Sequence, residues 1–234
     1  MAKIYAIIVA AGDGKRMGSK VKKPYLDLAG RPLLFYTLRN IIGFPLISGI
    51  VLVVGGGLID YCQHEVVEAF MIDGVVNIIE GGAERQDSVY HGLKALPEDA
   101  DLVMIHDGVR PFVSCKIIEE TIAAAVEYGA AITGVRVKDT IKLVDESHRV
   151  VQTVNRTGLW AVQTPQVFKA KLLRDCYDKA MDKGFYGTDD ASIVEWAGFE
   201  VKIVEGEYEN IKITTPFDLM VAEAMMEKVV IREP

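Results

Sequence analysis

The chain of 234 residues is 50% apolar and 25% charged, a globular composition that excludes a disordered or low-complexity protein. Its formal net charge of −7 disfavours a general nucleic-acid binder or a protein that coats an anionic membrane, because both polyanions repel an acidic surface. The cysteines, Cys62, Cys115 and Cys176, are far apart and lack CxxC spacing, so we expect no disulfide framework, no zinc site and a cytoplasmic location.

Apolar runs of strand length begin at residue 4 and recur along the chain. They are apolar nearly throughout, which is typical of parallel strands that are covered on both faces. The first run ends at Gly12, is too short to span a bilayer and has no cleavage region, so we expect neither a membrane segment nor a targeting signal. The predicted strands cover residues 4–11, 49–55, 74–81, 101–107, 130–137 and 200–206.

Amphipathic segments of helix length lie between these strands. One of them has Ser114 at its N-cap position and ends at Gly129. The alternation predicts an α/β fold, a doubly wound and mostly parallel Rossmann-like sheet, in which ligands bind at the carboxyl ends of the strands. The predicted helices cover residues 31–43, 58–70, 85–96, 114–128, 169–183, 189–197 and 215–229.

The segment 138–156 interrupts the alternation. It is too polar for a core helix, and two β-rich limbs flank a turn at 145–148, which predicts a projecting hairpin. A two-stranded hairpin is marginal in water, so it should pack on a second subunit or, alternatively, fold back on its own domain. We interpret the chain as a single domain, 1–234, with 138–156 as a projecting dimerisation arm.

A glycine turn and a basic cluster follow the first predicted strand. Backbone amides at Gly12 and Gly14 can approach a phosphate closely, because no side chain intervenes. The cations that follow repel one another unless a polyanion compensates them. The cluster consists of Lys15, Arg16, Lys20, Lys22 and Lys23.

Two familiar phosphate motifs do not fit this turn. A P-loop requires a glycine where Met17 stands, and in the dinucleotide fingerprint the third glycine would precede Gly18 by one position. The turn therefore argues against a nicotinamide-dependent dehydrogenase.

Further polar patches fall at or just beyond predicted strand ends. His106 and Asp107 follow one apolar strand and would be costly to bury without partners. Thr188 and Asp189 have two interpretations, a helix cap or part of a ligand site. The patches cover 80–89, 106–111, 163–168, 187–192 and 209–219.

Seven motifs spread over essentially the whole chain together resemble the 2-C-methyl-D-erythritol 4-phosphate cytidylyltransferases. The resemblance implies a glycosyltransferase-A-like Rossmann sheet and a homodimer joined through a β-arm. It also implies transfer of a cytidylyl group from CTP to methylerythritol phosphate, with release of pyrophosphate, in the non-mevalonate route to isoprenoids. The motifs are AAGDGKRMG, GGAERQDSV, HDGVRP, VKDTIK, WAVQTPQVF, TDDAS and NIKITTPFDL.

The resemblance also implies roles for matched residues. Arg16 and Lys23 would stabilise the α-phosphate region and the leaving group, while Arg156 and Lys212 would hold the attacking phosphate. The implied CTP contacts are Ala10, Ala11, Gly12, Gly14, Gly82 and Ser88, and the implied polyol phosphate contacts are Asp107, Arg110, Thr140, Thr164 and Thr188.

The family pattern places Thr140 and Arg156 of the arm in the neighbouring subunit's site. Mg²⁺ would be bound mainly through the triphosphate, and we assign it no protein ligand. The partners are then CTP, a polyol phosphate and a second copy of the chain.

Two positions depart from the family pattern. Lys22 competes with Lys23 as the functional lysine, and Ala83 stands where an aspartate is often found. Ribitol 5-phosphate cytidylyltransferases share most of these motifs and remain an alternative, although they favour Ala-Gly-Gly at the first turn. An alternative of another class is a non-catalytic nucleotide-binding module, against which the presence of all four proposed catalytic cations argues.

Overall fold

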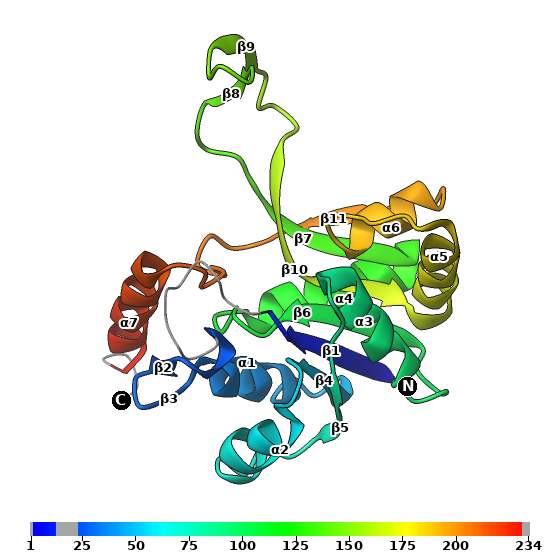
Figure 1. The fold of residues 1–234 in the computed structure, drawn as a ribbon, viewed down its shortest axis with the longest axis vertical. Coiled ribbons are helices and arrows are strands. Elements are labelled where there is room, and N and C mark those ends of the chain that lie inside the picture. The colour runs from blue at the N-terminus through cyan, green and yellow to red at the C-terminus, as the bar shows by residue number, and fades with distance from the viewer. Residues whose placement is uncertain (1, 13–22, 231–234) are drawn as a thin grey trace.

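The computed structural model describes residues 2–12 and 23–230, in which one large sheet forms the centre of the molecule (Figure 1). Its strand order is β11-β7-β10-β6-β1-β4-β5, and β10 is antiparallel to both of its neighbours while the other pairs are parallel. The strands are β1 (Ile4–Ala10), β4 (Ile47–Val54), β5 (Val75–Glu80), β6 (Leu102–Asp107), β7 (Ala130–Arg136), β10 (Trp160–Lys169) and β11 (Lys202–Glu205).

Helices cover the sheet on both faces because successive side chains of each strand point to opposite sides. Along β1, Ala6 and Ile8 join the core beneath α1 and α4, while Ile7 joins the core beneath α3, α5 and α6. The helices are α1 (Leu33–Ile42), α2 (Ile59–Cys62), α3 (Arg85–Lys94), α4 (Cys115–Tyr128), α5 (Ala170–Lys183), α6 (Asp190–Trp196) and α7 (Pro216–Val230).

The predicted cap of α4 is confirmed, and α7 begins with a cap of the same kind. The Ser114 hydroxyl accepts the Ile117 N–H at 3.2 Å, and Gly129 ends α4 at a φ of 89°, which glycine adopts without strain. The Thr215 hydroxyl accepts the Asp218 N–H at 3.2 Å, directly before Pro216 opens α7.

Several details differ from the sequence-based expectations. The predicted helix 58–70 is split into α2 and a π-helical turn, η3 (Gln63–Glu68). Strand β5 lies at an edge of the sheet and is partly exposed rather than covered on both faces. Strand β10 was not predicted, nor were the 3₁₀ turn η2 (Lys23–Tyr25) and the small hairpin of β2 (Asp27–Leu28) and β3 (Arg31–Pro32).

The predicted hairpin is confirmed as β8 (Ile141–Val144) paired with β9 (Val150–Val154). The Asp145 carboxylate closes its turn by accepting the backbone N–H groups of Ser147 and Arg149, each at 2.9 Å. Figure 1 shows the hairpin standing away from the body, at the end of extended segments that leave β7 and enter β10. Its exposed apolar side chains are those of Ile141, Leu143, Val144, Val150 and Val151.

Candidate active site

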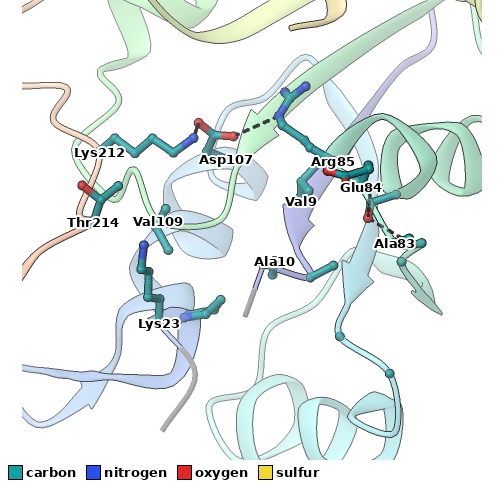
Figure 2. A pocket seen from close by; sticks show the side chains of 18 residues that line it. Val9, Ala10, Lys23, Ala83, Glu84, Arg85, Asp107, Val109, Lys212 and Thr214 are labelled. Carbon is teal, nitrogen blue, oxygen red and sulfur yellow. Dashed lines mark hydrogen bonds and ion pairs between the residues drawn. The ribbon is translucent and has the colours of Figure 1, made fainter. Parts of the chain in front are cut away.

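A pocket of about 560 Å³, which we call the first pocket, opens at the carboxyl edge of the sheet (Figure 2). Strands β1, β4, β5 and β6 end there, as expected for the ligand site of a doubly wound sheet. Its lining consists of Val9, Ala10, Ala11, Gly12, Lys23, Pro24, Gly55, Gly56, Gly81, Gly82, Ala83, Glu84, Arg85, Ser88, Asp107, Val109, Lys212 and Thr214.

The loop between β5 and α3 is closed tightly against the start of the helix. The Ser88 hydroxyl accepts the Gly82 N–H at 3.1 Å and donates to the Glu84 carbonyl at 3.1 Å. Glu84 and Asp87 form a reciprocal capping box at the same helix end. A Cβ at Gly82 would lie 2.2 Å from the Cβ of Asp87, so a glycine is required for this loop to pass so close to the helix.

Asp107 ends β6 and is surrounded by cations (Figure 2). Its Oδ2 lies 2.9 Å from the Lys212 Nζ and 3.4 Å from the Arg110 Nε, and its Oδ1 lies 3.7 Å from the Arg85 Nε. Burial alone would raise the pKa of the Asp107 carboxyl, but these three cations outweigh it and hold that pKa well below its usual range. The carboxylate therefore stays ionised, and the cations around it leave an excess of positive charge.

His106 stabilises the end of β6 from the protein interior. Its Nε2 donates to the Arg110 carbonyl at 3.1 Å, a group that can only accept, so its Nδ1 accepts the Thr164 hydroxyl at 3.0 Å. Thr164 in turn accepts the Asp107 N–H at 3.1 Å. Burial lowers the pKa of His106 to about 4, so the ring is neutral and serves to fix the Asp107 backbone.

A pocket of about 440 Å³, which we call the second pocket, adjoins the first. Arg85, Asp107 and Lys212 line both pockets and therefore form their common wall. Beyond that wall the second pocket reaches Arg110, Thr164 and the loop before α6, where Thr188 and Asp189 lie. Gln166 of β10 fixes this loop, because its amide donates to Asp189 at 2.8 Å and accepts the Ala191 N–H at 3.1 Å.

The structure brings most of the predicted site residues together. Thr140 and Arg156 are exposed on the arm and line neither pocket as the described residues form them; Arg156 donates to the Lys138 carbonyl. Gly14 and Arg16, with the competing Lys22, lie outside the residues that the structure describes. The first pocket holds Ala10, Ala11, Gly12, Lys23, Gly82 and Ser88, the second holds Arg110, Thr164 and Thr188, and both hold Asp107 and Lys212.

Arg85, which lines both pockets, was not among the predicted site residues. It belongs to a patch that the sequence did single out, residues 80–89, but its position on the common wall depends on a partner far along the chain, Asp190. An arginine at the first turn of a helix, where the helix dipole favours acidic side chains, was the available signal.

This sheet, with a cation-lined pocket beyond the carboxyl ends of its strands, defines the class of α/β nucleotide-binding proteins. Within that class the particular assignment follows from the sequence pattern of the 2-C-methyl-D-erythritol 4-phosphate cytidylyltransferases, which matches residues 4–228. The chain belongs to this family.

Individual relatives agree with the family assignment. The 2-C-methyl-D-erythritol 4-phosphate cytidylyltransferase of Geobacillus thermodenitrificans is 50% identical over 222 residues, which cover 94% of this chain and 96% of that protein. The protein of the same name from Caldanaerobacter subterraneus is 47% identical over 225 residues, covering 96% and 99%. A crystal structure of the 4-diphosphocytidyl-2C-methyl-D-erythritol synthase of Anaerococcus prevotii superposes with a TM-score of 0.86 at 37% identity, covering 97% of this chain and 96% of that chain.

Proposed function

We propose that this chain transfers the cytidylyl group of CTP to 2-C-methyl-D-erythritol 4-phosphate in the non-mevalonate route to isoprenoids. The products are 4-diphosphocytidyl-2-C-methyl-D-erythritol and pyrophosphate. The observation that carries the proposal is the common wall of Arg85, Asp107 and Lys212. This wall places cations at the junction where a ligand in the first pocket would meet a ligand in the second. Family membership supplies the identity of both substrates.

The reaction needs no protein nucleophile. An oxygen of the methylerythritol phosphate attacks the α-phosphorus of CTP, one P–O bond forms, and the bond to the departing pyrophosphate breaks. Negative charge spreads over the transferring group and both neighbouring phosphates, so fixed cations stabilise the transition state. The Lys212 ammonium, held 2.9 Å from Asp107 on the common wall, is placed to hold the attacking phosphate.

The first pocket is the site we assign to CTP. Backbone at Ala10 to Gly12 and at Gly82 lets a nucleotide approach closely, and Ser88 keeps the Gly82 loop in place. Lys23, on the opposite side of the pocket from this loop, would bind the phosphates together with Arg16 (Figure 2).

The second pocket is the site we assign to the polyol phosphate, with Arg110, Thr164 and Thr188 around it. Thr140 and Arg156 would complete the site of a neighbouring subunit, since they lie on an arm that projects from their own body. The exposed apolar side chains of that arm support a homodimer, because a second copy would cover them.

The residues present fit a magnesium ion that arrives with the nucleotide. Among the residues that the structure describes, no three His, Cys, Asp or Glu side chains gather as a metal cage, and the Asp107 carboxylate on the pocket wall is already paired with cations. Mg²⁺ keeps several waters and binds phosphates with few protein ligands, which suits this donor set. When bound, it would neutralise charge on the triphosphate.

We place the reaction in the cytoplasm, where thiols such as the free Cys62, Cys115 and Cys176 stay reduced. Within residues 2–12 and 23–230, no helix combines the length and apolarity needed to cross a bilayer.

One assay tests the proposed function against its alternatives. The purified protein is given Mg²⁺ and each nucleoside triphosphate, paired in turn with methylerythritol 4-phosphate, ribitol 5-phosphate or a hexose 1-phosphate, and pyrophosphate release is followed. We expect release with CTP and methylerythritol 4-phosphate. Release of pyrophosphate with CTP and ribitol 5-phosphate instead would identify a ribitol 5-phosphate cytidylyltransferase. Binding of CTP without release in any pairing would leave a non-catalytic nucleotide-binding module.

A further inference from the structure

A fully buried carboxylate, Asp190, lies behind the common wall at the start of α6. Its Oδ1 accepts from the Arg85 Nη1 at 3.1 Å, and its Oδ2 accepts from the Arg85 Nη2 at 2.7 Å. The hydroxyl of Tyr177, itself buried on α5, donates to the same Oδ1. Three elements, α3, α5 and α6, thus meet in one hydrogen-bonded cluster.

The remaining nitrogen of the Arg85 guanidinium faces the site. Its Nε lies 3.7 Å from the Asp107 Oδ1, and the other oxygen of Asp107 lies 2.9 Å from the Lys212 Nζ (Figure 2). Opposite charges therefore alternate from the buried Asp190 through Arg85 and Asp107 to Lys212, whose side chain is 40% exposed. The series runs from the protein interior to the open pocket.

We propose that Arg85 is a positioning residue of the transfer reaction, clamped by Asp190 and Tyr177 so that it fixes Asp107 and, through Asp107, the Lys212 ammonium. This inference rests on the proposed function, which supplies the reaction in which Lys212 acts. A lysine side chain is long and flexible. A cation stabilises the transition state only if the cation is already in place when negative charge develops on the phosphates.

The geometry distinguishes positioning from direct binding of a phosphate. A guanidinium grips a phosphate or carboxylate with two parallel N–H groups, and Asp190 already occupies both terminal nitrogens of Arg85. Asp190 is fully buried and depends on this pair for compensation of its charge, so Arg85 is not free to turn toward a substrate.

The protonation states agree with the clamp. Burial alone would lower the pKa of Arg85, but the charges of Asp190 and Asp107 outweigh burial and raise that pKa. Burial and the Asp190 charge raise the pKa of Tyr177, so its hydroxyl keeps its proton and donates to the carboxylate. Arg85 is therefore charged and Tyr177 is neutral, as the clamp requires.

Steady-state kinetics of single variants and of one double variant test the proposal. We expect Arg85→Lys and Asp190→Asn to lower kcat by about 100-fold, the loss that a misplacement of about 1 Å produces, and Tyr177→Phe to lower it less. The KM for CTP should change by less than about twofold, because a loss of transition-state stabilisation falls on turnover. In an Asp107→Asn background, Asp190→Asn should cost less than about twofold more, because both act through one carboxylate.

The matched control is Arg174→Lys. Arg174 is a half-buried arginine of α5 that donates to the carbonyls of Leu93, Leu96 and Pro97, and it lines neither pocket. The proposal would be overturned if kcat fell equally in this control, or if the fold-losses in kcat of Asp107→Asn and Asp190→Asn multiplied in the double variant. Either result would indicate that the substitutions act through the general stability of the protein.

A crystal structure of the Asp190→Asn protein gives a readout that does not depend on activity. We expect Arg85 to turn away from Asp107 and the Lys212 ammonium to shift by about 1 Å or more. Arg85 and Lys212 in unchanged positions would overturn the clamp. If the wild-type protein releases no pyrophosphate, the proposed function fails, while this structural comparison still decides whether Asp190 holds Arg85.

Discussion

The Lys212 ammonium lies 2.9 Å from the Asp107 carboxylate, at the wall that two adjoining pockets share. Lys212 comes from the segment before α7 and Asp107 from the end of β6, so the pair depends on the whole fold. A phosphate oxygen that reaches this wall meets a cation already held in place, and the protein need not reorganise to provide it.

Removal of the Lys212 charge tests the role assigned to it. We expect Lys212→Gln to lower kcat by about 10²–10³, or about 2.7–4 kcal/mol, by analogy with loss of one oxyanion-hole donor. Lys171→Gln, which removes an exposed ammonium paired with Asp175 on α5, is the control and should leave kcat unchanged. A Lys212 variant that keeps wild-type turnover would remove this lysine from the mechanism.

The close approach of Gly82 to α3 predicts a selective loss of nucleotide binding. A Cβ at Gly82 would meet the Asp87 Cβ at 2.2 Å, so Gly82→Ala should displace the loop and raise the Kd for CTP by about tenfold. At Gly158 nothing among the described residues lies within 4 Å of an added Cβ, so Gly158→Ala serves as control. Calorimetry with CTP measures both, and equal affinities for the two variants would contradict the prediction.

The buried His106 predicts a loss of stability in mild acid. Its pKa is lowered to about 4 in the folded protein, whereas the unfolded chain binds the proton below about 6.5. The unfolded state therefore binds more protons between these values, and the free energy of unfolding should fall by about 3 kcal/mol as pH drops from 6.5 to 4.

Urea unfolding at several pH values measures this effect, with His106→Gln as the comparison. Glutamine does not titrate, so its unfolding free energy should fall less steeply than that of the wild type over the same range. Parallel curves for the two proteins would assign the acid sensitivity to other groups.

Mixed dimers test the shared site. If Arg156 serves the neighbouring subunit, an Arg156→Ala chain paired with a Lys212→Ala chain has one intact site, so each mixed dimer should have up to about half of the activity of a wild-type dimer. Arg149→Ala, at the exposed arm turn, is the control for a substitution in the arm and should leave the unmixed protein active. Mixtures that stay inactive although the chains have exchanged would show that each site is self-contained.

The sequence predicted the parallel strands well because their apolar runs are long and most of them end at or next to a glycine or an acidic residue. Strand β10 was missed for a physical reason: it carries Gln163, Thr164, Pro165 and Gln166, and polar residues and proline argue against a strand inside a sheet. Asn210 satisfies two of these groups by donating to the Gln163 side chain at 3.2 Å and to the Thr164 carbonyl at 2.9 Å.

The site could be predicted in part for a related reason. Motifs that directly follow neighbouring strands, such as Gly82 and Asp107, meet at one edge of any doubly wound sheet. The pair of Arg85 and Asp190 has no such local rule, because α3 and α6 come together only through the complete topology. The roles of Thr140 and Arg156 rest on family resemblance and remain predictions.

The projecting hairpin has a consequence for handling the protein. A ribbon of β8 and β9 with open strand edges and exposed apolar residues such as Val150 and Val151 is a template to which other exposed strands can add. If a second copy normally covers it, dilution below the dissociation constant of the dimer raises the fraction of chains whose ribbon is uncovered, so the fraction of the protein open to pairing with a foreign strand should rise on dilution.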